Sequence, residues 1–244
     1  MGYGELAMAL IRQDNEPVYV LHTYPFKETS LVAELFSKQF GRVVTVAKGA
    51  RRPRSAMRGQ LQAFQMFAAT WSGKNELKIL HGLEWADSLV SLQGEALMCG
   101  FYLNELLLRL LPREDAHKGL FEYYQATIKM LASGQDLATH LRRFELKLLQ
   151  EMGYAVPLRE DENGEAVLAD KTYRYEAEYG ASALNKTKNG VQLSGNTLLD
   201  MANDDYTSAQ TQQQSKQLMR YLLAHYLGDK PLHTRQLLID LQGL

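Results

Sequence analysis

Short apolar runs, separated by glycine, proline and other turn residues, fill the first third of the chain. Each run is rich in valine, leucine or aromatic residues, which is typical of β-strands. The runs cover residues 18–21, 31–36, 42–47, 61–71 and 77–83. Five short strands predict a small all-β barrel or sandwich. The OB-fold is a partly open five-stranded barrel that binds oligonucleotides, so the strand count favours that fold.

From about Leu89 onward, the apolar positions follow a helical period instead. Residues at 120, 124, 128 and 131 share one helix face, and those at 137, 141, 144, 148 and 152 share another. Further helices are predicted before Pro112, over 197–203, over 207–227 and from 234. Wide apolar faces at this spacing make a bundle. The chain is therefore predicted to be an α+β protein, with an OB-fold barrel over 1–84 and a helical domain over 85–244.

Residues 154–193 interrupt the helical pattern. Asn163-Gly164 and Asn189-Gly190 are turn signals, and Tyr173 and Tyr175 alternate as they would on a strand. This stretch is predicted to be a small irregular or β insertion within the helical domain.

The formal net charge is only −1, but the charge is unevenly distributed. Residues 1–80 carry eleven Lys and Arg against six Asp and Glu, whereas residues 81–244 carry sixteen against twenty-two. No acid lies between Glu34 and Glu76, a stretch with eight basic residues, six of them within 42–58. Like charges repel one another unless a counter-charge is near. The stretch is therefore either a solvated loop, a loop paired with acids of the C-terminal half, or a binding site for a polyanion.

The residue types in this stretch favour the polyanion site. Arginine outnumbers lysine, and guanidinium groups match phosphate oxygens bidentately. Gly49, Pro53 and Gly59 predict that the cations lie on a loop. The candidate DNA-binding cations are Lys48, Arg51, Arg52, Arg54 and Arg58, with Arg42 next. For Arg42, which begins a predicted strand, an ion pair with Glu34 or Glu28 is the alternative.

Aromatic side chains near the same strands are candidates for stacking on bases. Tyr24 and Phe26 flank Pro25 at a strand end, where exposure is expected. Phe64, Phe67 and Trp71 belong either to such a platform or, more commonly for residues of this type, to the barrel core.

Motifs for catalysis, metals and membranes are missing. The basic stretch has no carboxylates to hold metal ions for phosphoryl chemistry, and the chain has no Walker-type phosphate loop. The single cysteine, Cys99, excludes an internal disulfide and a multi-cysteine zinc site, and is predicted to be an inert core thiol. No secretory signal or membrane-length apolar run is recognised. We therefore expect a cytoplasmic protein that is not an enzyme and has no cofactor.

Several segments, in order and with compatible spacing, resemble one known family. They include VLHTYPFKETSL at 20–31, GRVVTVAKGAR at 41–51, YLNEL at 102–106, LRRFEL at 141–146 and YLG at 226–228. Over roughly residues 20–238 the sequence resembles the RecO family of bacterial recombination mediators. The first two segments are the most specific, because they join charge, strand and loop in one arrangement.

The resemblance implies an N-terminal OB-fold and a C-terminal helical domain. It implies binding to single- and double-stranded DNA and annealing of complementary strands. It also implies that, with RecR, the protein helps RecA to load onto DNA coated by single-stranded-DNA-binding protein (SSB), and that it contacts the acidic C-terminal tail of SSB. The resemblance implies a nucleoid-associated protein without enzymatic activity.

Two features depart from the family. Many members carry a four-cysteine zinc site near residues 154–193, and this stretch has no cysteine here. We therefore expect no zinc, and expect packing of Tyr173, Tyr175 and Tyr179 to hold its turns. In addition, the residues before Ile11 have no clear counterpart.

The candidate for the SSB tail is the pair Arg142 and Arg143, with Leu141 and Phe144 on either side. A cationic rim beside an apolar groove suits an acidic peptide with an aromatic anchor. The alternative is that both arginines pair with Glu145 or with other acids of the bundle.

The sequence thus predicts a DNA-binding mediator of recombinational repair. The main alternative is an OB-fold protein that binds RNA. A nuclease or glycosylase is a third class, which the missing carboxylate cluster disfavours.

Overall fold

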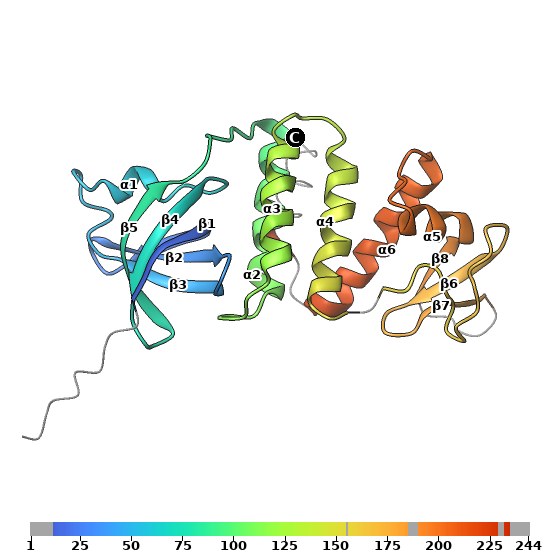
Figure 1. The fold of residues 1–244 in the computed structure, drawn as a ribbon. Coiled ribbons are helices and arrows are strands. Elements are labelled where there is room, and N and C mark those ends of the chain that lie inside the picture. Colours follow the sequence, from blue (N-terminus) through green and yellow to red (C-terminus); the bar gives the residue numbers. More distant parts are fainter. Residues whose placement is uncertain (1–11, 155, 185–189, 229–231, 235–244) are drawn as a thin grey trace, which may run out of the picture. The chain divides into compact units, whose positions relative to one another are not determined.

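The computed structural model (Figure 1) describes residues 12–154, 156–184, 190–228 and 232–234. The contacts divide the chain into two compact units. The barrel unit comprises the residues up to Ser91 together with Leu111–Glu122, and the helical unit comprises Leu92–Leu110 and the residues from Tyr123 onward. The domains predicted from the sequence, 1–84 and 85–244, differ from these units chiefly at 111–122. The residues before 12 and nearly all of the helix predicted from 234 lie outside the described part.

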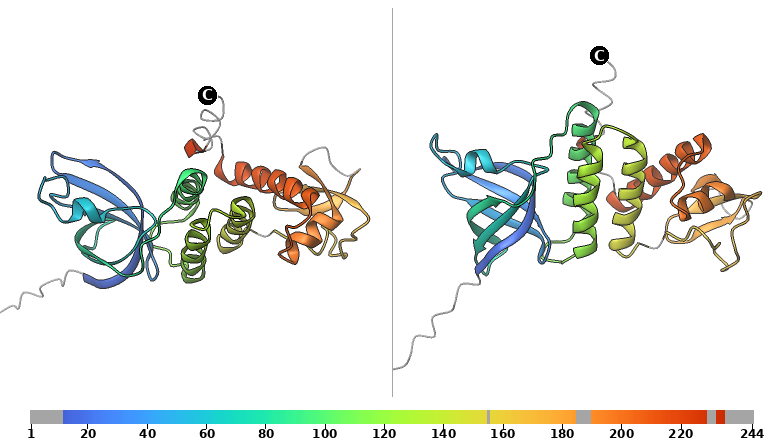
Figure 2. Two further views of the ribbon diagram at one scale, coloured as in Figure 1. Left: turned by 90° about the horizontal axis from the view of Figure 1, so that it is seen from above. Right: turned by 45° about the horizontal axis from the view of Figure 1, so that its top comes forward.

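Five strands close into a barrel, which Figure 2 shows from two further directions. They are β1 (Arg12–Phe26), β2 (Ser30–Ser37), β3 (Gly41–Ala47), β4 (Met66–Ser72) and β5 (Leu77–Trp85). Around the barrel their order is β1-β2-β3-β5-β4, and neighbouring strands are antiparallel except β3 and β5, which are parallel. A single-turn helix, α1 (Met57–Gln60), connects β3 to β4. The five-stranded barrel expected from the sequence is confirmed, and it is OB-like.

One predicted strand is shorter than its apolar run. The run at 61–71 becomes a strand only from Met66, since Phe64 has a φ of 67°, which lies in the left-handed region that strands do not use. Residues 57–60 instead form the α1 turn.

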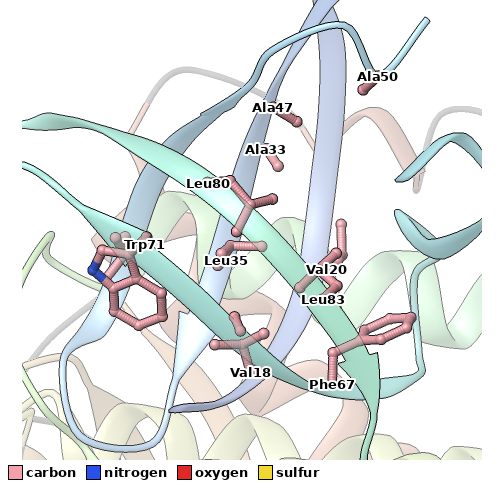
Figure 3. Packing of buried hydrophobic residues seen from close by; sticks show 12 residues of the cluster. Val18, Val20, Ala33, Leu35, Ala47, Ala50, Phe67, Trp71, Leu80 and Leu83 are labelled. Atoms are coloured by element: carbon pink, nitrogen blue, oxygen red, sulfur yellow. The ribbon is translucent and has the colours of Figure 1, made fainter. Parts of the chain in front are cut away.

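Alternate residues of the strands fill the barrel, and Figure 3 shows them converging on one interior. They include Val18 and Val20 of β1, Ala33 and Leu35 of β2, and Phe67, Ala69 and Trp71 of β4. Full burial of one large side chain contributes roughly 1.5–3 kcal/mol. Phe64, Phe67 and Trp71 are 5%, 0% and 1% exposed, so these three aromatics belong to the core rather than to a stacking platform.

Residues 111–122 belong with the barrel because their side chains and backbone pack on it. The ring of Phe121 lies 5.5 Å from that of Tyr19 and 5.4 Å from that of Phe36. The backbone of Asp115 lies against Gly41, which has a φ of 65°. A Cβ at Gly41 would come within 1.8 Å of the Asp115 carbonyl oxygen, so only glycine fits this contact.

Helices dominate the second unit. Its elements include α2 (Gly94–Leu110), α4 (Leu137–Glu151), α5 (Gly195–Ala202) and α6 (Ala209–Leu227), and the unit boundary falls inside α3 (Lys118–Leu131). Helix α4 contacts both α2 and α6 (Figure 1). Leu120, Tyr124, Ile128 and Leu131, the predicted apolar face of α3, are all fully buried. Helix α2 is the helix predicted before Pro112, and one of its large apolar side chains, Phe101, is 42% exposed.

The insertion predicted at 154–193 contains a three-stranded antiparallel sheet. Its strands are β6 (Thr172–Glu176), β7 (Gly180–Ala183) and β8 (Val191–Ser194), in the order β7-β6-β8. Tyr173 and Tyr175 alternate on β6 and are buried, as predicted. Tyr179 is 67% exposed, so the expectation that it packs in this segment is wrong. Tyr179 falls in the turn between β6 and β7, beyond the buried alternation.

The described residues contain neither a cluster of metal ligands nor a helix that could span a membrane. No three His, Cys, Asp or Glu side chains come together as a metal site in that part of the chain. None of the helices described is long and apolar enough to cross a membrane.

Candidate nucleic-acid interface

The stretch that we call the basic segment, residues 48–58, leaves the end of β3 in a series of turns and enters α1. The amide of Arg51 donates to the carbonyl of Thr29 (2.9 Å), and the amide of Arg52 donates to the carbonyl of Gly49 (3.0 Å). Gly49 has a φ of 70°, which favours glycine at this turn. The backbone hydrogen bonds give the segment a defined path beside the turn between β1 and β2.

Apolar residues anchor the basic segment to the barrel. Ala50 is fully buried in the barrel core, and Met57 packs against the same cluster, as does Leu61 just beyond the segment. Since these residues occupy the inward positions, the polar residues between them are left on the solvent side. One detail differs from the prediction: Arg58 and Gly59 lie in the helical turn α1 rather than in a loop.

The five principal cations of the segment are exposed. Lys48, Arg51, Arg52, Arg54 and Arg58 are all in this class, and none forms an ion pair with a carboxylate within the described ranges. The Arg51 guanidinium donates to the carbonyls of Lys27 (3.5 Å) and Glu28 (3.2 Å). These carbonyls orient the side chain without neutralising it. The segment therefore presents five positive charges to solvent.

Lys27 is a further cation beside the basic segment that sequence reasoning missed. It lies exposed in the turn between β1 and β2, the turn to which Arg51 is bonded. Its Nζ is 5.4 Å from the centroid of the Phe26 ring. Only the pairing of β2 with β3 brings this turn to the segment. The local sequence indicates this role of Lys27 only weakly, through a lysine in a turn next to the candidate Phe26.

The two candidate aromatics have different surroundings. Phe26 is half-buried against Val32, Val44 and Val46 on the outer side of the barrel. Tyr24 is 38% exposed, and its hydroxyl donates to Glu34 Oε1 at 3.2 Å. Burial, and then the Glu34 carboxylate, raise the pKa of Tyr24. Neither ring is fully exposed, so each offers at most part of a face or an edge to a base.

Arg42 forms the ion pair that the sequence left open as its alternative. Its Nη1 lies 3.3 Å from Glu34 Oε2, its Nε donates to the carbonyl of Leu111 at 3.0 Å, and its side chain is only 15% exposed. Glu34 is also approached by Arg113 Nη2 at 3.4 Å, and Arg113 pairs with Glu76 as well. Arg42 therefore holds the barrel to residues 111–115, and we leave it out of the candidate interface.

Comparison with known proteins identifies the family. The model described as "Recombination protein O N terminal" matches residues 8–89, and "Recombination protein O C terminal" matches residues 91–236. A DNA repair protein RecO of Nitrosospira multiformis is 52% identical over 236 residues, which cover 96% of this chain and 98% of that protein. Another, of Aromatoleum aromaticum, is 51% identical over 235 residues, covering 96% of this chain and 98% of that protein. This chain belongs to the RecO family.

The resemblance to the RecO family noted in the sequence is thereby confirmed. The relatives are DNA repair proteins by name. The N-terminal family match spans the described barrel strands and the entire basic segment. The candidate interface therefore lies within the region that the family model matches.

The second candidate site of this RecO-family chain, residues 141–144, is occupied by interactions within the helical unit. Arg142 lies 2.7 Å from Glu145 Oε1 and its side chain is 11% exposed, while Arg143 lies 2.7 Å from Asp204 Oδ1. Phe144 is fully buried against other aromatics of the bundle, and Leu141 is half-buried.

These contacts correct the prediction, made from the sequence, that residues 141–144 together form a site for the SSB tail. Both arginines pair with acids of the bundle, which is the alternative that the sequence left open. Phe144 is a core residue, because its position in the helical period points it inward, and it cannot line an open groove. Only Arg143, whose side chain is 30% exposed, keeps a charged group near solvent.

Proposed function

We propose that this RecO-family chain is a DNA-binding mediator of recombinational repair and not an enzyme. The observation that supports this most is the basic segment: five exposed cations, without carboxylate partners among the described residues, on an OB-like barrel. Such a segment binds the phosphates of single- and double-stranded DNA without reading sequence, since mixed Arg and Lys mainly contact the backbone.

The same charge explains annealing of complementary strands. Two strands repel each other through their phosphates, and a protein that neutralises part of that charge lowers the repulsion between them. In this proposal the chain brings strands together and then, with RecR, helps RecA to replace SSB on single-stranded DNA. It acts in the cytoplasm, at the nucleoid.

The acidic tail of SSB remains a proposed partner, but its proposed site is now Arg143 alone rather than residues 141–144. A tail carboxylate would have to replace Asp204 at Arg143, because Arg142 is held by the fully buried Glu145. Arg143→Glu should weaken binding of a fluorescent acidic tail peptide, whereas Lys171→Glu, at another exposed cation, should leave it unchanged. Equal binding by both variants would remove Arg143 from the proposal.

Salt dependence tests the role of the basic segment in DNA binding. On single strands each phosphate contact contributes a slope of about −0.7 to the logarithm of affinity against the logarithm of salt, so five contacts predict about −3.5. A fluorescence anisotropy titration measures this slope. A value flatter than about −1 would mean that the segment does not bind DNA.

Annealing tests the function itself. Complementary strands coated with SSB should anneal faster with the wild-type chain than with the triple variant Arg51→Glu, Arg52→Glu, Arg54→Glu. The control is Lys118→Glu, Lys171→Glu, Lys216→Glu, which makes the same charge change at exposed positions outside the segment. Equal loss in both triple variants would contradict a specific role of the segment. A strong preference for RNA over single-stranded DNA of equal length would replace the proposal with the RNA-binding alternative.

A further inference from the structure

A hollow of about 220 Å³ lies on the barrel unit where the basic segment ends. Residues of α1, including Met57 and Gln60, line one side, and residues of β1, β4 and β5 line the rest. Pockets that hold whole drug-sized molecules are larger, roughly 300–1,000 Å³. This hollow is therefore suited to one chemical group of a larger ligand.

The lining residues suit a flat heterocycle rather than a phosphate. Asn15, Gln60 and Thr70 supply amides and a hydroxyl, His81 supplies a ring, and Glu84 supplies a carboxylate. No lysine or arginine lines the hollow, and the Glu84 carboxylate repels an anion. A nucleobase, by contrast, carries donors and acceptors on its edge and an apolar face on either side.

Several of these polar groups are available to a ligand. In the described part of the chain, no hydrogen bond or ion pair engages the side chains of Asn15, Gln60 or Glu84. The Thr70 hydroxyl accepts from the backbone amide of Asn15 (3.4 Å), and His81 Nε2 is bonded to Ser72 Oγ (2.7 Å). The hollow therefore combines groups that are already oriented with groups that lack a partner.

Gly82 keeps the hollow open. It lies within β5, its backbone is outside the left-handed region, and a Cβ built on it meets nothing within 4 Å. Neither strain nor crowding therefore requires glycine at this position. Glycine inside a strand is unfavourable, and is often found where a ligand approaches closely. Gly82 pairs with Thr70 across β5 and β4, and both residues line the hollow, so a side chain at 82 would lie on the same face of the sheet as that of Thr70.

The hollow is continuous with the basic segment. Arg58 lies on α1 between Met57 and Gln60, which both line the hollow, and Arg58 is exposed. In a nucleotide the base is only a sugar away from its phosphate. A strand whose phosphate is bound by Arg58 can therefore place its base in the hollow.

We propose that this hollow binds one unpaired base of a single DNA strand whose phosphates lie on the basic segment. The proposal rests on the proposed DNA-binding function and adds a subsite to it. A base within a duplex is stacked and paired, so the hollow acts only on single strands. It therefore favours single strands over duplexes, which the basic segment alone, as a phosphate site, does not.

The test compares an oligonucleotide with one of the same length in which every base is replaced by an abasic site. The wild-type chain should bind the base-containing strand about fivefold more tightly, the lower end of what one stacked base contributes. Gly82→Leu, which fills the hollow, should reduce this ratio to about one, with binding of the abasic strand and its salt slope unchanged. Gln192→Leu, which adds the same side chain at an exposed position of β8, should keep the ratio.

A second variant keeps the test valid if Gly82→Leu folds poorly. Glu84→Gln is close in shape and exposed. It removes a carboxylate acceptor from the hollow, so the ratio of base-containing to abasic binding should fall, even though loss of the negative charge strengthens phosphate binding of both strands. The proposal is overturned if the wild-type ratio is about one, or if both hollow variants keep the wild-type ratio. Charge reversal at Arg51, Arg52 and Arg54 should weaken binding of both strands in parallel. If reversal has no effect on either strand, the proposed function fails, whatever the hollow does.

Discussion

Arg42 and Arg51 lie in the same acid-free stretch of sequence, and substitution of each by glutamine should have opposite consequences. Arg42 pairs with Glu34, whose side chain is 6% exposed. The Arg51 side chain is exposed, and among the described residues it donates only to two backbone carbonyls. We expect Arg42→Gln to affect stability and Arg51→Gln to affect DNA binding.

The magnitudes follow from what each substitution leaves behind. Removing one partner of a buried ion pair costs about 3–5 kcal/mol, because it leaves the other charge buried without compensation. Glu34 would keep Arg113 at 3.4 Å and the Tyr24 hydroxyl at 3.2 Å, so we expect Arg42→Gln to cost about 2 kcal/mol. Arg51→Gln should cost less than about 1 kcal/mol, as is usual for exposed charges.

Two measurements separate these effects. Both tryptophans of the chain, Trp71 and Trp85, lie in the barrel unit, so tryptophan fluorescence in urea follows unfolding of that unit. Arg51→Gln should make the salt slope of single-strand binding flatter by about 0.7, and Arg42→Gln should leave the slope unchanged. The reasoning fails if Arg42→Gln lowers the slope while the urea midpoint stays at the wild-type value.

Three further predictions concern stability and reactivity. Gly41→Ala should lower the free energy of unfolding in urea by more than about 3 kcal/mol, because the new Cβ clashes with a backbone carbonyl and alanine is strained at a left-handed φ. Gly164→Ala should lower it by only about 1–2 kcal/mol, because Gly164 has a φ of 79° but open space around it. Burial, with a smaller effect of Glu95, raises the pKa of Cys99 to about 11. About one thiol in a thousand is then ionised at pH 8, so native protein should react with iodoacetamide far more slowly than unfolded protein. Tyr175→Phe removes a buried hydroxyl that lacks a partner among the described residues and should leave thermal stability unchanged or raised, whereas Tyr124→Phe breaks a 2.6 Å bond to an asparagine and should cost about 1–2 kcal/mol; equal costs would contradict the assignment.

The sequence predicted those features that burial along one strand or helix determines. Val18 and Val20 alternate inward in β1, and Tyr173 and Tyr175 do so in β6, because a strand turns every second side chain to the same face. The apolar face of α3 was predicted correctly because residues that follow the helical period of 3.6 lie on the same side of a helix.

Features that depend on contacts between distant segments were not predicted. Residues 111–122 join the barrel through Phe121, which contacts Tyr19 and Phe36 more than eighty residues earlier in the chain. Lys27 joins the basic segment only because β2 and β3 pair. The hollow next to α1 likewise requires four separate parts of the chain to meet, and none of its lining residues forms a motif.

Whether an arginine forms an ion pair depends on which carboxylate lies nearest to it in space. Distance along the sequence predicts that carboxylate only in part. Arg142 is three residues from Glu145 on one helix, so their pairing is local and could be expected. Arg51, Arg52 and Arg54 have no acid nearby in the sequence, and none pairs with them in the described structure. Arg42 breaks the pattern because it is on β3, directly beside β2, which carries Glu34. Arg42, on the sheet, is thus paired with a carboxylate, whereas the arginines after the end of β3 have no carboxylate partner among the described residues. For this reason we propose the segment after β3, rather than β3 itself, as the part that binds DNA.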